Sequence, residues 1–239
     1  MKVWLNHSGA TAPELHRLLR FISKTTLTLC LSMMGVKVQR PEPLRGNPVT
    51  ARLTLIAHAA TEAQRHAAFP LDDVITEREM AKIAALHWNV PRAEGVWSAP
   101  EQRTQETSRL LGLAATVADE MRDCNYGKWG GRRMEEVQSE DPDGILVWLT
   151  DPSAAPHGGE SIEDLIVRIG RWMDEQRGAS HTVAVTHSAV IRAAIVYALR
   201  IPVLAFWRFD IAPLTLTDLR FGPDVWTLRC TGCALKSEE

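Results

Sequence analysis

The stretch Leu53-Thr54-Leu55-Ile56-Ala57-His58-Ala59-Ala60-Thr61 begins as an apolar strand and ends in a histidine between alanines. Residues 53–56 suit a buried strand, and the small residues that follow allow the chain to turn away from a sheet. A histidine at such a strand end is either a core residue or part of a reactive site. The stretch therefore predicts a strand that carries His58 at its carboxyl end.

Apolar runs suited to strands alternate with amphipathic runs from Ala51 onward, which is typical of a sheet with crossover helices. We predict strands at residues 52–57, 95–98, 115–118, 182–186, 214–220 and 225–230. We predict helices at residues 76–87, 101–111, 161–177 and 189–199, the third with Ser161 as its N-cap and one apolar stripe. The predicted fold class is α/β, a three-layer α/β/α sandwich with a mostly parallel central sheet.

Length and composition predict one substantial folded domain. The chain has 239 residues, of which 45% are hydrophobic and 23% charged, as in soluble globular proteins. Its 27 basic and 29 acidic residues give a formal charge of −2, so no overall field recruits nucleic acid or an anionic membrane. Three prolines and a glycine in residues 40–48 indicate a linker. We therefore expect an N-terminal extension and linker over 1–50 and a single domain over 51–239.

The extension and the cysteines favour a cytoplasmic protein without a metal or cofactor. An apolar segment at residues 25–36 resembles part of a secretory signal, but no small-x-small cleavage site follows and the segment is too short to span a bilayer. Four cysteines are sparse for a disulfide scaffold and suit a reducing compartment. The CxxC at residues 230–233 has no further ligands at metal spacing, so free thiols on a late strand are favoured over a metal or redox site.

Polar residues follow three of the predicted strands. They are His58, Arg103 within residues 98–107 at a helix start, and His187 after an apolar strand. Ligands of open α/β sheets bind at the carboxyl ends of the strands, and a helix N-terminus adds unpaired N–H donors for an anion. Each feature alone is more often structural, but their joint occurrence favours a local anion site.

These residues resemble motifs of the histidine phosphatase superfamily, in its phosphoglycerate-mutase-like branch. The resemblance covers residues 52 to about 231 and rests on five motifs in the family's order. The family's Arg-His-Gly motif corresponds to Ala57-His58-Ala59, and its Ser-x-x-x-x-Arg-x-x-x-Thr motif to Ser98, Arg103 and Thr107. Its acidic motif corresponds to residues 121–131, with Asp123 in place of glutamate. Its Gly-Gly-Glu-Ser motif corresponds to residues 158–161, and its second histidine motif to residues 185–188. The resemblance implies the same sandwich fold.

The resemblance also implies a covalent mechanism on a phosphorylated small-molecule substrate. His58 would attack phosphorus and form a phosphohistidine, while His187 and Arg103 stabilise the transferring group. Asp123 would protonate the leaving oxygen and then deprotonate water. The residues alone leave open whether Asp123 is a solvated loop carboxylate. The predicted substrate-binding residues are Thr61, Gln64 and Ser188.

One departure from the family motif bears on activity. Ala57 stands where the family has arginine, a permanently charged clamp for phosphate, and Ala59 replaces glycine. Either a second cation replaces that charge, with Arg65, Arg122, Arg132 and Arg133 as candidates, or the site hydrolyses poorly.

Two functions follow. We favour a phosphomonoester hydrolase of weak or narrow activity over a catalytically quiet module that binds a phosphorylated ligand or a protein partner.

Residues 131–157 are predicted to cover the site, but their sequence does not indicate which substrate it binds. Trp129, Trp148 and Trp172 are predicted to lie in the core. The sequence leaves homo-oligomerisation open.

Overall fold

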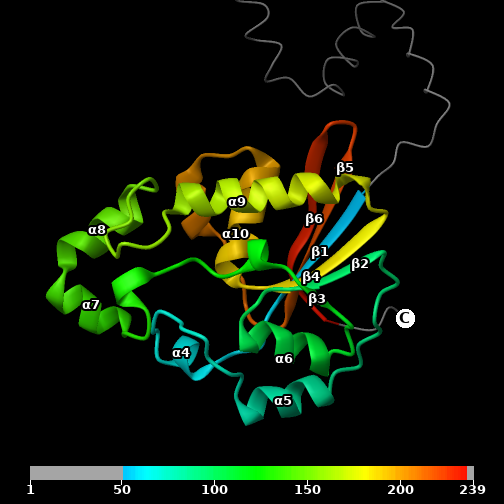
Figure 1. Ribbon diagram of the computed structural model, residues 1–239, viewed down its shortest axis with the longest axis horizontal. Coiled ribbons are helices and arrows are strands. Elements are labelled where there is room, and N and C mark those ends of the chain that lie inside the picture. The colour runs from blue at the N-terminus through cyan, green and yellow to red at the C-terminus, as the bar shows by residue number, and fades with distance from the viewer. Residues whose placement is uncertain (1–50, 236–239) are drawn as a thin grey trace, which may run out of the picture. The chain divides into compact units, whose positions relative to one another are not determined.

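A computed structural model describes residues 51–235, in which six strands form one sheet (Figure 1). Along the sheet the strand order is β3-β2-β4-β1-β5-β6. In chain order the strands are β1 (Ala51–Ala57), β2 (Gly95–Ser98), β3 (Thr116–Val117), β4 (His181–Thr186), β5 (Thr215–Gly222) and β6 (Val225–Ala234). The sequence therefore predicted each strand, with small differences at the ends.

The two strands that end in histidine lie next to each other near the middle of the sheet. β1 and β4 pair in parallel, and β4 is buried along its whole length because helices cover both faces. β2 pairs in parallel with β3 and β4, whereas β5 runs antiparallel to β1 and β6. The predicted α/β fold with a mostly parallel sheet is confirmed.

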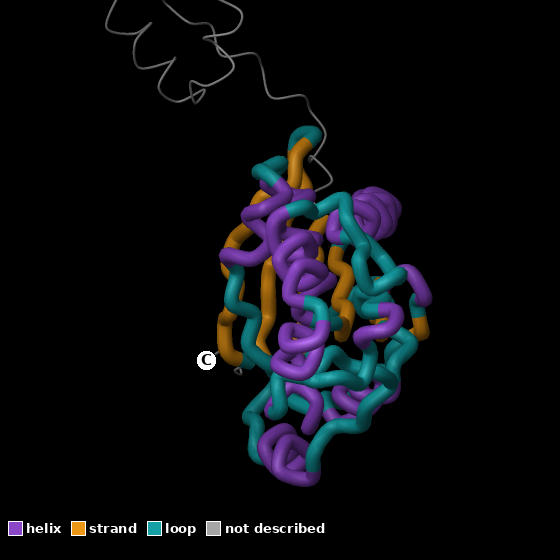
Figure 2. The backbone as a smooth tube through the Cα atoms, turned by 90° about the vertical axis from the view of Figure 1, so that its left-hand side faces the viewer, coloured by secondary structure: helices purple, strands orange, loops and turns teal. Residues whose placement is uncertain are grey.

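Two helices pack on each face of the sheet and complete three layers. Leu53 and Leu55 of β1 belong to the core formed with α9 (Ile162–Glu175) and α10 (Ser188–Leu199). Ile56 belongs to the opposite core, formed with α5 (Glu77–Ala84) and the end of α6 (Gln102–Leu110). Figure 1 shows these two pairs of helices on either side of the strands, and Figure 2 shows a helical layer in front of the strands. These are the four predicted helices.

The structure adds three α-helices that the sequence did not predict. They are α4 (Glu62–Arg65), α7 (Met134–Glu140) and α8 (Pro142–Thr150). Asp141 is the N-cap of α8, since its side chain accepts a hydrogen bond of 2.9 Å from the backbone N–H of Gly144. The segment 131–157, expected as an insert over the site, is therefore largely helical, and its covering of the site stays a prediction.

The predicted core tryptophans are buried. Trp129 and Trp148 pack with Phe69 in a small aromatic cluster, in which their ring centroids lie 5.8 Å apart. Trp172 lies in the larger core under α9. Aromatic rings supply much buried apolar area, so the cluster holds α8 against the body of the domain.

Some predictions fall outside the described residues. The extension and linker over 1–50, and Cys30 within it, are among them. Cys124, Cys230 and Cys233 are free thiols, the last two on β6 as expected. Between residues 51 and 235, no helix has both the length and the apolar character needed to cross a bilayer.

Candidate active site

The site is built at the carboxyl ends of β1 and β4. Ala57 pairs with Thr186 in the parallel register, so the histidine that follows each strand lies beside the other. The backbone N–H of His58 donates to the carbonyl of Thr186 at 2.9 Å and extends the ladder by one step. The ring centroids of His58 and His187 are 5.1 Å apart, and both residues are buried. The sheet thus brings together residues 129 positions apart, as the two strand ends predicted.

The surroundings of His58 fix which ring nitrogen can react. Its Nδ1 lies 2.7 Å from the carbonyl oxygen of Ala59. A carbonyl can only accept, so Nδ1 carries the proton and Nε2 keeps its lone pair. Burial, and then the charges of His187 and Arg103, hold the pKa of His58 well below its usual 6.5. His58 is therefore neutral at pH 7, with a free lone pair on Nε2.

Arg103 reaches the site from the first turn of α6. Its guanidinium donates to the Asp123 carboxylate at 2.8 Å and to the carbonyl of Leu71, and only 1% of its side chain is exposed. Thr107, one turn later, accepts from the backbone N–H of Ala59 at 3.0 Å and ties α6 to the end of β1. The predicted group of His58, His187, Arg103 and Asp123 is therefore brought together.

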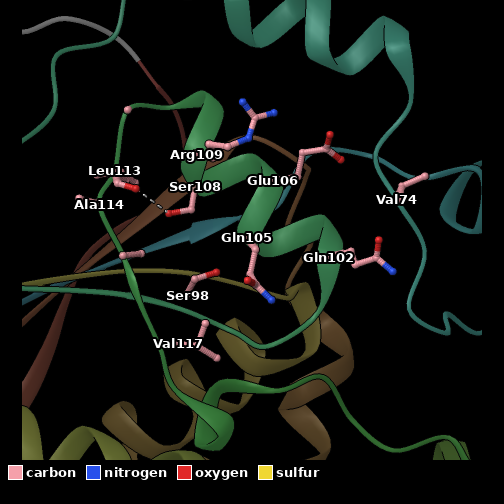
Figure 3. A pocket seen from close by; sticks show the side chains of 12 residues that line it. Val74, Ser98, Gln102, Gln105, Glu106, Ser108, Arg109, Leu113, Ala114 and Val117 are labelled. Atoms are coloured by element: carbon pink, nitrogen blue, oxygen red, sulfur yellow. Dashed lines mark hydrogen bonds between the residues drawn. The ribbon is translucent and has the colours of Figure 1, made fainter.

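Part of α6 lines a separate groove. Residues 103, 104, 107 and 108 are the buried residues of the helix, and Ser108 lines this groove together with Gln102, Gln105, Glu106 and Arg109 (Figure 3). The groove has a volume of about 780 Å³, and none of the four predicted catalytic residues lines it. Its size alone does not make it the reactive site, because the chemistry-bearing side chains lie elsewhere.

Glu101 is a site residue that the sequence reading missed. Its Oε2 accepts a hydrogen bond of 2.8 Å from Nε2 of His187, and its Oε1 accepts one of 2.9 Å from the backbone N–H of Asp123. Burial opposes ionisation of Glu101, but its hydrogen bond and charge interaction with His187 prevail and lower its pKa to about 2. Glu101 is therefore a carboxylate at neutral pH. The sequence offered one signal for Glu101 as a site residue, which is its position between Ser98 and Arg103 in the predicted motif.

Arg168 of α9 holds the loop that carries Asp123. Its guanidinium forms a two-armed ion pair with Glu160, at 2.6 and 2.7 Å. It also donates to the backbone carbonyls of Glu120, Arg122 and Asp123. Paired guanidinium and carboxylate groups are among the strongest polar contacts in proteins, so Asp123 sits on an anchored loop. The Gly-Gly-Glu-Ser motif, which contains Glu160, thus acts on the site through this anchor.

The three remaining predicted residues lie at the starts of α4 and α10. Thr61 and Gln64 bond each other as a capping box at the start of α4. Ser188 is the first residue of α10, directly after His187. Their proposed contacts with substrate stay predictions.

Three of the four arginines considered as a replacement for the missing clamp are paired with carboxylates outside the site. Ala57 is itself buried in the core. Arg65, Arg122 and Arg132 pair with carboxylates of Glu62, Asp119 and Glu140, respectively. Within residues 51–235, neither these three nor Arg133 forms an ion pair with a site carboxylate.

Comparisons with known proteins find related sequences. A bifunctional protein of Mycobacterium tuberculosis is 30% identical over 189 residues, which are 73% of this chain and 51% of that protein. Phosphoserine phosphatase 1 of Hydrogenobacter thermophilus is 26% identical over 170 residues, covering 66% of this chain and 81% of the enzyme. The chain thus spans about half the length of the first of these curated relatives.

Solved structures share the fold at lower identity. The α-ribazole phosphatase of Shigella flexneri matches with a TM-score of 0.69 and 22% identity, over 79% of this chain and 100% of that one. A mycobacterial glucosyl-3-phosphoglycerate phosphatase matches with a TM-score of 0.66 and 22% identity, over 77% and 100% of the two chains. The sequence model of the histidine phosphatase superfamily (branch 1) matches residues 53–233. The chain belongs to this superfamily, as its motifs predicted.

Proposed function

We propose that the protein is a phosphomonoester hydrolase that works through a phosphohistidine on His58. The observation that carries the proposal is the state of His58: its Nδ1 donates to Ala59, burial lowers its pKa, and Nε2 is left as a nucleophile beside His187 and Arg103. Attack by Nε2 on phosphorus splits one difficult displacement into two easier ones.

The neighbouring residues have complementary roles in this proposal. Arg103 and His187 stabilise the oxygens of the transferring phosphoryl group through N–H donors. Asp123 lies within reach of both, 2.8 Å from the Arg103 guanidinium and 3.5 Å from Nδ1 of His187. It protonates the leaving oxygen in the first step and activates water in the second. Thr61, Gln64 and Ser188 are proposed to contact the substrate.

The substrate class is proposed from the relatives. Proteins similar to this chain are named as phosphatases of phosphoserine and of glucosyl-3-phosphoglycerate, which are phosphorylated small molecules. A phosphorylated small molecule is therefore the proposed substrate, without nucleic acid or membrane as a partner. A cytoplasmic location is proposed from the sparse cysteines, which suit a reducing compartment.

One observation favours a second candidate, a catalytically quiet module that binds a phosphorylated ligand or protein. Ala57 stands where the family has a cation, and one nitrogen each of His187 and Arg103 already bonds a carboxylate. A site with fewer free cations stabilises the charge of a transferring phosphoryl group less, which lowers the rate of hydrolysis.

Labelling of His58 separates the two candidates. The full chain is incubated with a panel of phosphomonoesters, and acid-labile phosphate and released alcohol are both measured, with His58→Ala as the control. If the protein is a hydrolase, the wild type should carry acid-labile phosphate that His58→Ala lacks. If no ester in the panel gives either label or turnover with wild type, the hydrolase is excluded and the binding module is favoured.

A further inference from the structure

The carboxylate of Glu101 contacts the site rather than its own helix. Glu101 is the residue before α6, yet its side chain makes no capping hydrogen bond to that helix. Instead it bridges Nε2 of His187 and the backbone N–H of Asp123. Two residues that lie 86 and 22 positions away in the chain thus share one carboxylate.

Two of the donors that a phosphoryl group would use are already bonded to carboxylates, whereas Nε of Arg103 and Nδ1 of His187 have no hydrogen-bond partner among the described residues. Nε2 of His187 donates to Glu101, and the guanidinium of Arg103 donates to Asp123. The other ring nitrogen of His187, Nδ1, faces the Asp123 carboxylate at 3.5 Å. Nδ1 forms no hydrogen bond within residues 51–235, so the bonded donor of the ring is Nε2, and a phosphoryl oxygen can bond Nε2 only if the Glu101 carboxylate moves.

Glu101 is the carboxylate that can give way. Asp123 is fixed by Arg103 and by the anchored loop, and its side chain is 12% exposed. Glu101 has no ion pair with a lysine or arginine in the described part of the chain, and its side chain is 17% exposed. A phosphate that enters also brings negative charge, which repels the Glu101 carboxylate at short range.

We infer that Glu101 is a built-in anionic competitor, which occupies the position of a phosphoryl oxygen on His187 until the substrate displaces it. The inference rests on the proposed function, because it assumes that this site binds a phosphoryl group. It predicts that the site binds a phosphoryl group more weakly than His58, Arg103 and His187 would without Glu101. The alternative is that Glu101 only positions His187.

Binding of an unreactive oxyanion distinguishes the two roles of Glu101. Tungstate affinity is measured by calorimetry on the full chain, for wild type, Glu101→Gln and Glu101→Ala. Glu106→Gln is the matched control, since Glu106 lies on the groove side of the same helix. We expect both Glu101 variants to bind tungstate at least about tenfold more tightly, because removing one like charge at contact distance changes affinity by an order of magnitude or more. The control should stay within about twofold of wild type.

A double variant tests whether the added tungstate affinity arises at His187. In Glu101→Ala combined with His187→Ala, the added affinity should disappear, since the oxyanion then lacks the freed donor. The KM for any turned-over ester should fall more than kcat changes, as expected when ground-state binding improves. Thermal melting identifies any variant that fails to fold, and Glu101→Gln keeps the side-chain volume as the milder change.

The outcomes for Glu101 and for the hydrolase are separable. Equal or weaker tungstate binding in both folded Glu101 variants, including no binding at all, overturns the competitor and leaves a positioning residue. Tighter tungstate binding without phosphohistidine on His58 would instead support the competitor and contradict hydrolysis. Phosphohistidine on His58 of the wild type, without tighter tungstate binding in the Glu101 variants, would support hydrolysis and contradict the competitor.

Discussion

The two histidines at the ends of β1 and β4 occupy equivalent places in the fold and have different surroundings. Both follow buried parallel strands in register. His58 bonds a backbone carbonyl, and burial lowers its pKa. His187 bonds the Glu101 carboxylate and lies near a second one. The sheet therefore fixes where each ring lies, whereas the neighbours decide whether a ring offers a lone pair or an N–H donor.

Removal of each ring gives the largest expected difference between the two strand ends. His58→Ala should abolish phosphohistidine and lower turnover by at least about 10³, because the nucleophile is lost. His187→Ala should lower the rate by about 10² to 10³, as expected for one lost transition-state donor, and leave His58 labelled. Single-turnover labelling with a phosphomonoester measures both. The exposed His66→Ala is the control, and phosphate found on His187 would reverse the roles assigned to the two ends.

Asp123 lies between the two ends and is tested by the leaving group. Asp123→Asn should lower kcat/KM by about 10² to 10⁴ for alkyl phosphates, since general acid catalysis is lost. An aryl phosphate with a stable phenolate needs no proton and should lose far less. The neighbouring, exposed Asp119→Asn should behave as wild type with both esters. A uniform loss across the two esters would show that Asp123 acts through Arg103 rather than as the acid.

Ala57→Arg would give the β1 end the cation it lacks. The rate should rise by about 10² to 10³, the usual effect of one electrostatic donor at such a site. Ala57 is buried, so the variant should melt at lower temperature, and tungstate should restore part of the loss by pairing with the new charge. Ala57→Gln adds similar length without charge and serves as the control. If Ala57→Arg folds and is no faster, the missing clamp does not limit activity.

The two strand ends also show which features of the fold and the site can be predicted from the sequence. Apolar runs that stop at His58 and His187 are local signals, and parallel strands must present their carboxyl ends at one edge. Arg103 was identifiable because it stands in a helix start after a strand. These features depend on residues close in the chain, so the sheet, the histidines and the arginine were all predicted.

Glu101 and α8 were missed for different reasons. A glutamate before a helix is an ordinary first-turn charge, and its bond to His187 depends on a rotamer and on a loop fixed by Arg168. No local pattern carries that information. The start of α8 did carry a signal, since Asp141 and Pro142 are a capping residue and a favoured first residue. The short apolar run after them does not distinguish helix from strand.

The smallest expected difference between the two strand ends is in how the free energy of unfolding depends on pH. The pKa of His58 is lower in the folded than in the unfolded chain, so the unfolded chain binds more protons below pH 6.5. The free energy of unfolding should therefore fall as pH falls from 7 to 5, by up to about 1.4 kcal/mol per pH unit from this residue. Urea titrations at several pH values should show a shallower decline for His58→Ala.

Glu101 at the β4 end should act in a lower pH range. Its folded pKa of about 2 lies below the usual 4.5, so its contribution is complete above pH 4.5 and is lost as pH falls toward 2. Glu101→Gln should flatten the stability curve only in that range, and His58→Ala only above it. Since the two residues belong to one connected site, overlap of the two ranges would mean that His58 and Glu101 titrate as a coupled pair. The separate environments of the two strand ends would then be one environment, in which Glu101 charge also sets the protonation of the nucleophile.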